Sequence, residues 1–337
     1  PRRRTECPSS APPGKRGLFV FGPRRRFKPA GTCSRLPPDS EPHRAGGNAV
    51  AHSTNIPIDS ATAPTRSAGE ENFPVGSWLL PKHLRAHIAR YYAFARAADD
   101  IADDPGRTPE GKRAELDAME AVLQGEEPAA AGSADQAKAK RLAESLDETH
   151  VPVAHGAELL IAFRLDADKS RYATWDELMG YCRHSAAPVG RYLLDLHDES
   201  HATWPASDAL CASLQVLNHL QDCAEDYARM DRVYLPLDML DAASCHITEL
   251  SAASASTGLR RVLDACLDGC DRLNGEARAL PGMVRNRRMR MEAAVIVAVA
   301  HRLAQRLRLG DPLAGRVALG RWDKIVCLLS GLRAGLW

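Results

Sequence analysis

From Glu70 to the C-terminus, apolar residues recur every three or four positions, and no stretch alternates as a half-buried strand does. One stripe follows Pro81, a suitable first helical residue, and comprises Leu84, Ile88, Tyr91, Ala95 and Ala98. The same period predicts helices at about 109–123, up to 146, 152–168, from 174, from 207, 256–279, 284–309 and after 312. The pattern therefore predicts an all-α bundle with a central cavity.

Several residues predict where these helices begin or break. Thr174 and Glu177 have the spacing of a capping box, and Ser207 is expected to cap the following long helix. Pro188 and Gly190 interrupt an otherwise helical segment. We expect a kink or break there.

Two pairs of aspartates lie within these apolar helices. Asp99 and Asp103 are four residues apart, and so are Asp222 and Asp226. On a helix, carboxylates at this spacing share one face and repel by a few tenths of a kcal/mol, so a compensating cation is expected. Mg²⁺ takes oxygen ligands and is usually held by one or two carboxylates plus substrate phosphates. Lone acidic pairs are usually solvated, but two such helices facing each other would form a diphosphate site.

The charge is unevenly distributed along the 337 residues, although the formal net charge is only +1. Residues 1–68 carry 12 Lys/Arg against 4 Asp/Glu and half of the 22 prolines, which leaves 32 against 39 charges for the remainder. We interpret residues 1–68 as a disordered basic extension without a folded role, although its composition also resembles a transit peptide. Residues 69–337 are expected to form the all-α domain.

Five segments of the chain resemble the squalene/phytoene synthase family, whose members join or rearrange prenyl diphosphates. In order, they run from Glu71 to Ser77, Tyr92 to Asp103, Tyr181 to Gly190, Asn218 to Asp226, and Arg232 to Pro236. Their order and spacing fit from about residue 70 to the C-terminus. The resemblance implies an isoprenoid-synthase helical fold in which the two aspartate pairs hold Mg²⁺ ions against a substrate diphosphate.

The resemblance also assigns polar contacts to the substrate. Arg96 would contact the leaving group, and Asn218 and Gln221 would help to place metal or phosphate. Asn72 and Arg183 are further candidate substrate-binding residues. Pre-positioned charges of this kind neutralise a departing diphosphate where it forms.

Three tyrosines are assigned to the reaction chamber by the same resemblance. Tyr92 and Tyr181 would line it, and Tyr234 would lie near its mouth. A carbocation needs an apolar pocket that excludes stray water, and a tyrosine ring offers it a π face.

Two segments depart from the condensing members of the family. Asn72 to Val75 replaces a segment that commonly contains Lys and Ser, and His184 to Pro188 replaces a Val-Ala-Gly run. Both resemble bacterial hopanoid-pathway members that ionise presqualene diphosphate, rearrange the cation and add water to give hydroxysqualene. This reaction needs no NADPH, and it implies partners that make the substrate and reduce the product.

Two other functions are alternatives. The chain would condense two farnesyl or geranylgeranyl diphosphates to presqualene diphosphate, squalene or phytoene, or it would be a helical scaffold whose acids bind Ca²⁺. The placement of both acid pairs within helices, rather than in a Ca²⁺ loop, argues against the scaffold.

The remaining reactive or charged residues are interpreted as structural. Cys266 and Cys270 are expected to pack in the core, and the nine scattered cysteines fit a reducing, cytoplasmic compartment. His184 and His219 are expected at the core or its rim. The basic stretch from Arg285 to Arg290 is expected to be a solvated face, with peripheral contact to the inner membrane surface as the alternative. No nucleic-acid partner is expected.

Overall fold

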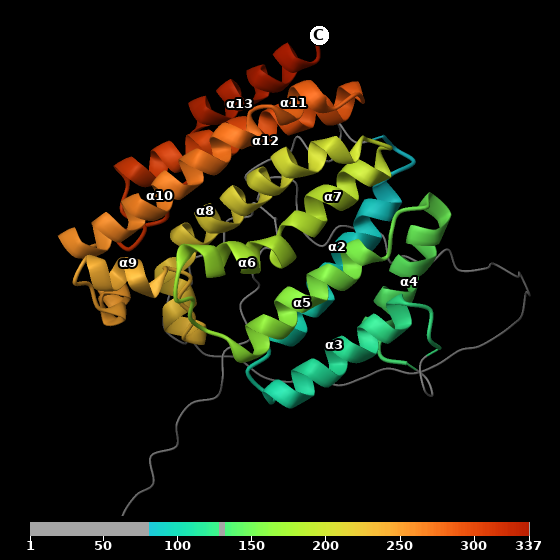
Figure 1. The fold of residues 1–337 in the computed structure, drawn as a ribbon, viewed down its shortest axis with the longest axis horizontal. Coiled ribbons are helices and arrows are strands. Elements are labelled where there is room, and N and C mark those ends of the chain that lie inside the picture. Colours follow the sequence, from blue (N-terminus) through green and yellow to red (C-terminus); the bar gives the residue numbers. More distant parts are fainter. Residues whose placement is uncertain (1–80, 128–131, 337) are drawn as a thin grey trace, which may run out of the picture.

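The computed structural model describes residues 81–127 and 132–336, and within them the only β-type pairing is one isolated bridge between Arg171 and Val233. All other regular structure there is helical, which confirms the predicted all-α class (Figure 1). The predicted extension at 1–68 and the candidate residue Asn72 lie outside the described residues.

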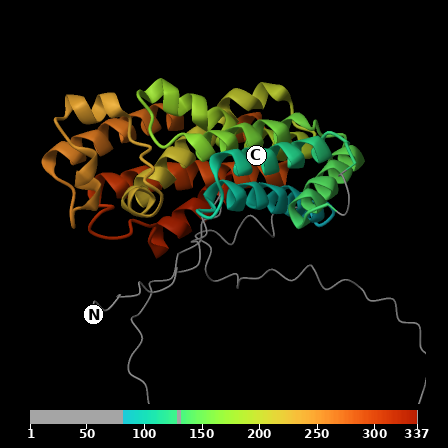
Figure 2. The same ribbon diagram turned by 90° about the horizontal axis from the view of Figure 1, so that it is seen from below.

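Four helices form the N-terminal part of the bundle: α2 (Arg85–Asp103), α3 (Pro109–Leu123), α4 (Ala134–Thr149) and α5 (Ala154–Asp168). They enclose a hydrophobic cluster in which Phe94, Leu116, Leu142 and Leu159 are fully buried. In the view of Figure 2, α2 and α3 lie close together at one end of the elongated bundle.

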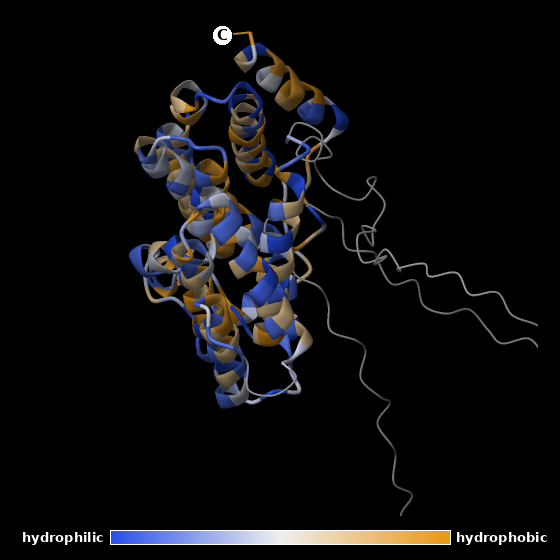
Figure 3. Cartoon of the chain, turned by 90° about the vertical axis from the view of Figure 1, so that its right-hand side faces the viewer, coloured by the Kyte–Doolittle hydropathy of each residue, from blue (hydrophilic) through white to orange (hydrophobic). Residues whose placement is uncertain are grey.

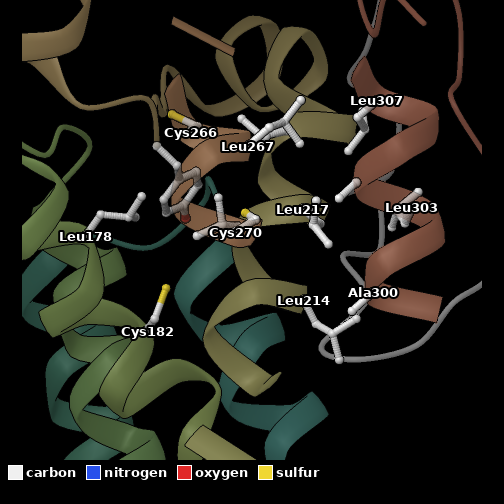
Figure 4. Close-up of a cluster of buried hydrophobic side chains, with 14 of the residues drawn as sticks. Leu178, Cys182, Leu214, Leu217, Cys266, Leu267, Cys270, Ala300, Leu303 and Leu307 are labelled. Atoms are coloured by element: carbon white, nitrogen blue, oxygen red, sulfur yellow. The ribbon is translucent and has the colours of Figure 1, made fainter. Parts of the chain in front are cut away.

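The remaining helices enclose a second, larger cluster. They are α6 (Trp175–Ser185), α7 (Ala187–Leu196), α8 (Trp204–Met230), α9 (Leu237–Ala242), α10 (Thr257–Ala277), α11 (Leu280–Met283), α12 (Arg287–Leu309) and α13 (Arg321–Ala334), with short 3-10 turns at His201–Thr203 and Ile247–Ser251. Figure 4 shows side chains of α6, α8, α10 and α12 meeting in this core. Cys266 and Cys270 lie there, fully buried, as predicted.

One predicted helix start is confirmed without its full capping box, and another is wrong. The Thr174 side chain does accept a hydrogen bond from the Glu177 amide at 3.2 Å, but the Glu177 carboxylate accepts from the Ala173 amide instead of closing the capping box. Ser207 is buried within α8 and caps nothing, because α8 already begins at Trp204, with a proline in its first turn. A proline favours that early position because its ring fixes the helical φ and no amide is lost.

The predicted break between α6 and α7 is confirmed. Ala186, with φ −129° and ψ −46°, separates the two helices. Beyond the break, a Cβ at Gly190 would lie 2.5 Å from the Ser207 Oγ and 2.7 Å from the Cys211 Sγ. Glycine at this position therefore lets α7 and α8 approach closely.

The C-terminal helices α12 and α13 run antiparallel along one edge of the bundle (Figure 1). The Arg306 side chain pairs with Asp323 at 2.8 Å near one end, and the Arg287 Nε donates to the Gly335 carbonyl at 2.7 Å near the other. Arg285, at the start of the basic stretch that leads into α12, has a side chain that is 70% exposed, in agreement with the predicted solvated face. No helix in the described part of the chain is both long and apolar enough to cross a bilayer.

Candidate active site

The C-terminal half of α2 carries the first predicted acid pair. Its alanine-rich sequence buries Asp99, which is only 5% exposed, against the bundle. The Arg96 guanidinium lies one turn earlier and donates to the Asp99 carboxylate at 2.9 Å and to Asp100 at 2.5 Å. Arg96, which was predicted to contact the leaving group, therefore lies directly beside the first acid pair in the structure.

Arg232 joins the ends of α2 and α8. Its side chain donates to the Asp103 carboxylate at 3.0 Å and to the Ala102 carbonyl at 3.3 Å, and its backbone amide donates to the Asp226 carbonyl at 3.2 Å. Each acid of the α2 pair therefore has an arginine against it. The like-charge repulsion that led us to expect a cation is balanced by two guanidinium groups.

Asp166, at the end of α5, is the centre of a buried polar cluster that we call the Asp166 cluster: Asp103, Asp166, Tyr181, Arg232 and Tyr234. The phenols of Tyr181 and Tyr234 donate to its two carboxylate oxygens at 2.9 and 3.0 Å. Arg232 donates to its backbone carbonyl at 2.6 Å and lies 3.9 Å from its carboxylate. The cluster fixes two of the three predicted chamber tyrosines, Tyr181 and Tyr234, beside α2.

Sequence reasoning missed Asp166, although the chain carries a signal for it. Leu159, Ala162, Phe163 and Asp166 are all buried and have the i, i+3, i+4, i+7 spacing of one helix face. An acid in the register of a core stripe is expected to have a specific partner. The partners, however, lie on other helices and cannot be read from this period.

Aromatic rings form one wall of the same region. Tyr172, Tyr181 and Tyr234 lie with ring centroids 5.3 to 5.5 Å apart, and the His219 ring stacks on Tyr234 at 3.5 Å. Burial and the nearby Asp166 carboxylate raise the pKa of the Tyr172 phenol. The ring faces of this wall are apolar, and the Tyr172 phenol stays protonated at neutral pH.

The second acid pair lies on α8 beside this wall. Asp226 is 5% exposed and has a carboxylate oxygen 3.7 Å from the His219 Nδ1, whose other ring nitrogen lies 3.1 Å from the Gln215 amide nitrogen. Asp222, one turn earlier, is half-buried. Burial raises the pKa of the intervening Cys223 thiol to about 12, so this cysteine is not a thiolate nucleophile at neutral pH.

The other candidate residues are not members of the Asp166 cluster. The Gln221 side-chain amide donates to the Val317 carbonyl at 2.5 Å, and Asn218 is half-buried on α8. Tyr92 is 42% exposed on α2, and Arg183 is exposed near the end of α6. The structure brings Tyr181, Tyr234 and the α2 acids together, but it does not draw Arg183 into that group.

The donor chemistry fits Mg²⁺ only in combination with a ligand that supplies more oxygens. No three His, Cys, Asp or Glu side chains among residues 81–127 and 132–336 lie close enough to hold a metal ion by themselves. Instead, α2 and α8 each carry two aspartates that are four residues apart. Mg²⁺ is commonly bound in this way, by one or two carboxylates, waters and substrate phosphates.

Comparison with known proteins identifies the family. Residues 67–323 match the model of the squalene/phytoene synthase family. The chain is 44% identical over 265 residues to a hydroxysqualene synthase of Sinorhizobium fredii, covering 79% of this chain and 88% of the relative. A hydroxysqualene synthase of Rhodopseudomonas palustris is 44% identical over 250 residues, which cover 74% of this chain and 84% of the relative.

Solved structures agree in fold. A squalene synthase, HpnC, from Alicyclobacillus acidocaldarius superposes with a TM-score of 0.62 at 30% identity, over 71% of this chain and 88% of that chain. A dehydrosqualene synthase in complex with a ligand superposes with a TM-score of 0.63 at 23% identity, over 76% of this chain and 88% of that chain. At this identity the likeness supports the fold alone. The helical architecture, the family match and the 44% identical relatives agree, and the chain belongs to the squalene/phytoene synthase family.

Proposed function

We propose that this enzyme ionises presqualene diphosphate, rearranges the resulting cyclopropylcarbinyl cation and captures water to give hydroxysqualene and diphosphate. The carbon–oxygen bond to diphosphate breaks, a new bond to a water oxygen forms, and one water proton is released. The reaction is redox-neutral, so it needs no NADPH. The observation that carries the proposal is the meeting of both acid helices beside an aromatic wall, in a chain similar to hydroxysqualene synthases.

The polar side of the site would bind the diphosphate. Asp99, Asp103, Asp222 and Asp226 would hold Mg²⁺, which as a Lewis acid stabilises the charge of the departing diphosphate. Among the protein's own groups, Arg96 and Arg232 are already fixed beside the α2 acids by ion pairs of 2.9 and 3.0 Å.

These arginines are suited to a phosphate ligand because a guanidinium presents several donors in a fixed planar fork. Their positions are set before substrate arrives, so little reorganisation is needed when negative charge develops.

The aromatic side of the site would protect the carbocation. Tyr181 and Tyr234 both direct their hydroxyl protons to Asp166, which fixes the orientation of the two rings. Fixed ring faces stabilise a nearby cation through their quadrupoles, and buried, protonated phenols are poor nucleophiles. The wall thus favours rearrangement over early capture of the cation.

The proposal includes a location in the cell and partner enzymes. A cytoplasmic location with peripheral contact to the inner membrane face suits an enzyme with an apolar product. Partner enzymes would form presqualene diphosphate upstream and reduce hydroxysqualene downstream.

Product analysis tests the reaction. Purified protein with Mg²⁺ and without NADPH is offered presqualene diphosphate and farnesyl diphosphate in separate tubes, in detergent. Hydroxysqualene from presqualene diphosphate alone is the expected result. Consumption of farnesyl diphosphate would instead identify a condensing synthase and overturn the proposal.

Neutralising one acid in each pair tests the proposed metal ligands. Asp99→Asn and Asp222→Asn should each abolish turnover without loss of helical circular dichroism. Asp100→Asn is the matched control on α2, since its exposed carboxylate shares the same Arg96. Glu225→Gln is the matched control on α8, where the Glu225 carboxylate pairs with Arg229. Full turnover in either Asp99→Asn or Asp222→Asn would contradict the assignment.

A further inference from the structure

The C-terminal helix α13 exposes a continuous apolar face. We call it the α13 face; its members are Trp322 (77% exposed), Ile325 (45%), Leu328 (37%), Leu329 (56%), Leu332 (50%) and, just beyond the helix, Leu336 (80%). Their spacing places them on one side of a helix. They are six of the ten large hydrophobic side chains exposed in the described part of the chain, so the exposure is concentrated here.

The opposite side of α13 is firmly packed on α12. Asp323, Cys327 and Gly331 are buried there. A Cβ at Gly331 would collide with the Val295 side chain and lie 3.0 Å from the Met291 carbonyl oxygen. The helix is thus fixed by one face and exposes the other. Figure 3 shows hydrophobic and hydrophilic residues interspersed along this C-terminal helix.

The charges around the α13 face are basic. Arg321 and Arg333 are exposed on α13, and Lys324 is half-buried. Asp323, the acid of this helix, is buried and paired with Arg306 at 2.8 Å. An amphipathic helix with Trp and Leu on one side and Arg or Lys at its flanks is typical of binding to the interfacial region of a bilayer.

We propose that the α13 face binds the surface of an anionic lipid bilayer, with its apolar side chains in the interfacial region and its arginines against lipid phosphates. Anionic lipid complements the basic flanks. A second copy of the chain would bring the same basic flanks against themselves. The segment at residues 1–68, with 12 Lys/Arg against 4 Asp/Glu, has the same sign of charge as the face.

The family match ends at residue 323, so most of the α13 face lies beyond the segment shared by the family model. The inference rests on exposure and charge, and it stands or falls independently of the proposed reaction. If both hold, the enzyme sits where an apolar product can leave directly into lipid.

Vesicle flotation of the full chain tests the inference without substrate. Vesicles of phosphatidylcholine with phosphatidylglycerol should carry the protein, and vesicles of phosphatidylcholine alone should carry less of it. The double variant Leu329→Glu, Leu332→Glu should lower the partition coefficient about thirtyfold, because two apolar side chains no longer enter the interface. Ile161→Glu is the matched control, since Ile161 is 39% exposed on α5, away from this face.

The basic flanks are tested separately with Arg321→Gln, Arg333→Gln. This variant should lose the preference for anionic vesicles while retaining weak binding to both kinds. Circular dichroism of each variant should match that of the wild type, and so should turnover of substrate in detergent.

Unchanged flotation of the Leu329→Glu, Leu332→Glu variant would overturn the inference, and so would failure of the wild type to bind anionic vesicles. In the second case, light scattering identifies the occupant. A wild-type dimer that the same substitutions dissociate would assign the α13 face to a second copy, and a monomer would exclude that occupant as well.

Discussion

Replacing Asp166 by Asn removes a buried charge from the centre of the Asp166 cluster. The carboxylate accepts hydrogen bonds from the Tyr181 and Tyr234 phenols at 2.9 and 3.0 Å. An asparagine side chain has one carbonyl oxygen and an amide that only donates, so one phenol loses its acceptor. Arg232 loses a carboxylate 3.9 Å away but keeps Asp103 at 3.0 Å.

The structure sets the expected size of the effect. A hydrogen bond to a charged group contributes about 1.5–3 kcal/mol, and a buried charge left wholly unpaired costs about 3–5 kcal/mol. Since Asp103 still balances Arg232, we expect Asp166→Asn to lower the free energy of unfolding by about 2–4 kcal/mol. For a chain of this size the melting temperature should fall by about 4–8 °C.

Urea and thermal unfolding followed by circular dichroism measure this loss. A double-mutant cycle with Tyr234→Phe isolates the shared hydrogen bond, and a coupling energy of about 1–2 kcal/mol is expected. Asp168→Asn is the control, since its exposed carboxylate pairs with Arg113 at the surface and should change stability by no more than about 1 kcal/mol. Additive effects of Asp166→Asn and Tyr234→Phe would refute the hydrogen-bond network on which the estimate rests.

Three further outcomes are expected. Burial raises the pKa of the Glu292 carboxyl to about 7, so the native state binds more protons than the unfolded state between about pH 4.5 and 7, and stability falls as the pH rises through this window. Glu292→Gln should remove this pH dependence, and its free energy of unfolding in urea should exceed that of the wild type by about 1–3 kcal/mol at pH 8. If the stability of the variant and of the wild type changed in parallel with pH, the raised pKa of Glu292 would be contradicted. Gly190→Val should lower the free energy of unfolding by about 1–3 kcal/mol, because its side chain would enter the space of the Ser207 hydroxyl, and an unchanged melting curve would argue against that close approach. Chelation of divalent cations should stop turnover yet leave the far-ultraviolet circular dichroism unchanged, because arginines balance the α2 acids; loss of helix on chelation would show that this balance is insufficient.

Local periodicity was sufficient to predict the helical class and to place the two acid pairs on helices. The stripe containing Tyr91, Ala95 and Ala98 is buried on α2 as expected, and the i, i+4 spacing located the acidic helix faces. Helix starts were less certain because several residues compete to cap them. Ser207 has a suitable side chain, but the Trp-Pro step three residues earlier already allows the helix to begin.

The rest of the site depends on contacts between residues far apart in the chain. Arg232 meets Asp103 across 129 positions and the Asp166 carbonyl across 66, and no local pattern relates them. The substrate contact of Arg183 was predicted only from its place in a familiar segment, and the residue lies exposed on α6. The proximity of an acid, an arginine and two phenols is a product of helix packing.

The ion pairs of α2 have a thermodynamic consequence under the proposed function. Arg96 and Arg232 occupy the same carboxylates that a cation would use, so a cation arriving alone must compete with both guanidinium groups. A diphosphate offers these arginines another anionic partner and thereby releases carboxylate lone pairs to the metal. Linkage requires the reverse as well, because each ligand raises the affinity for the other by the same factor. The enzyme would therefore bind metal and substrate cooperatively, and little metal would be bound in the absence of substrate.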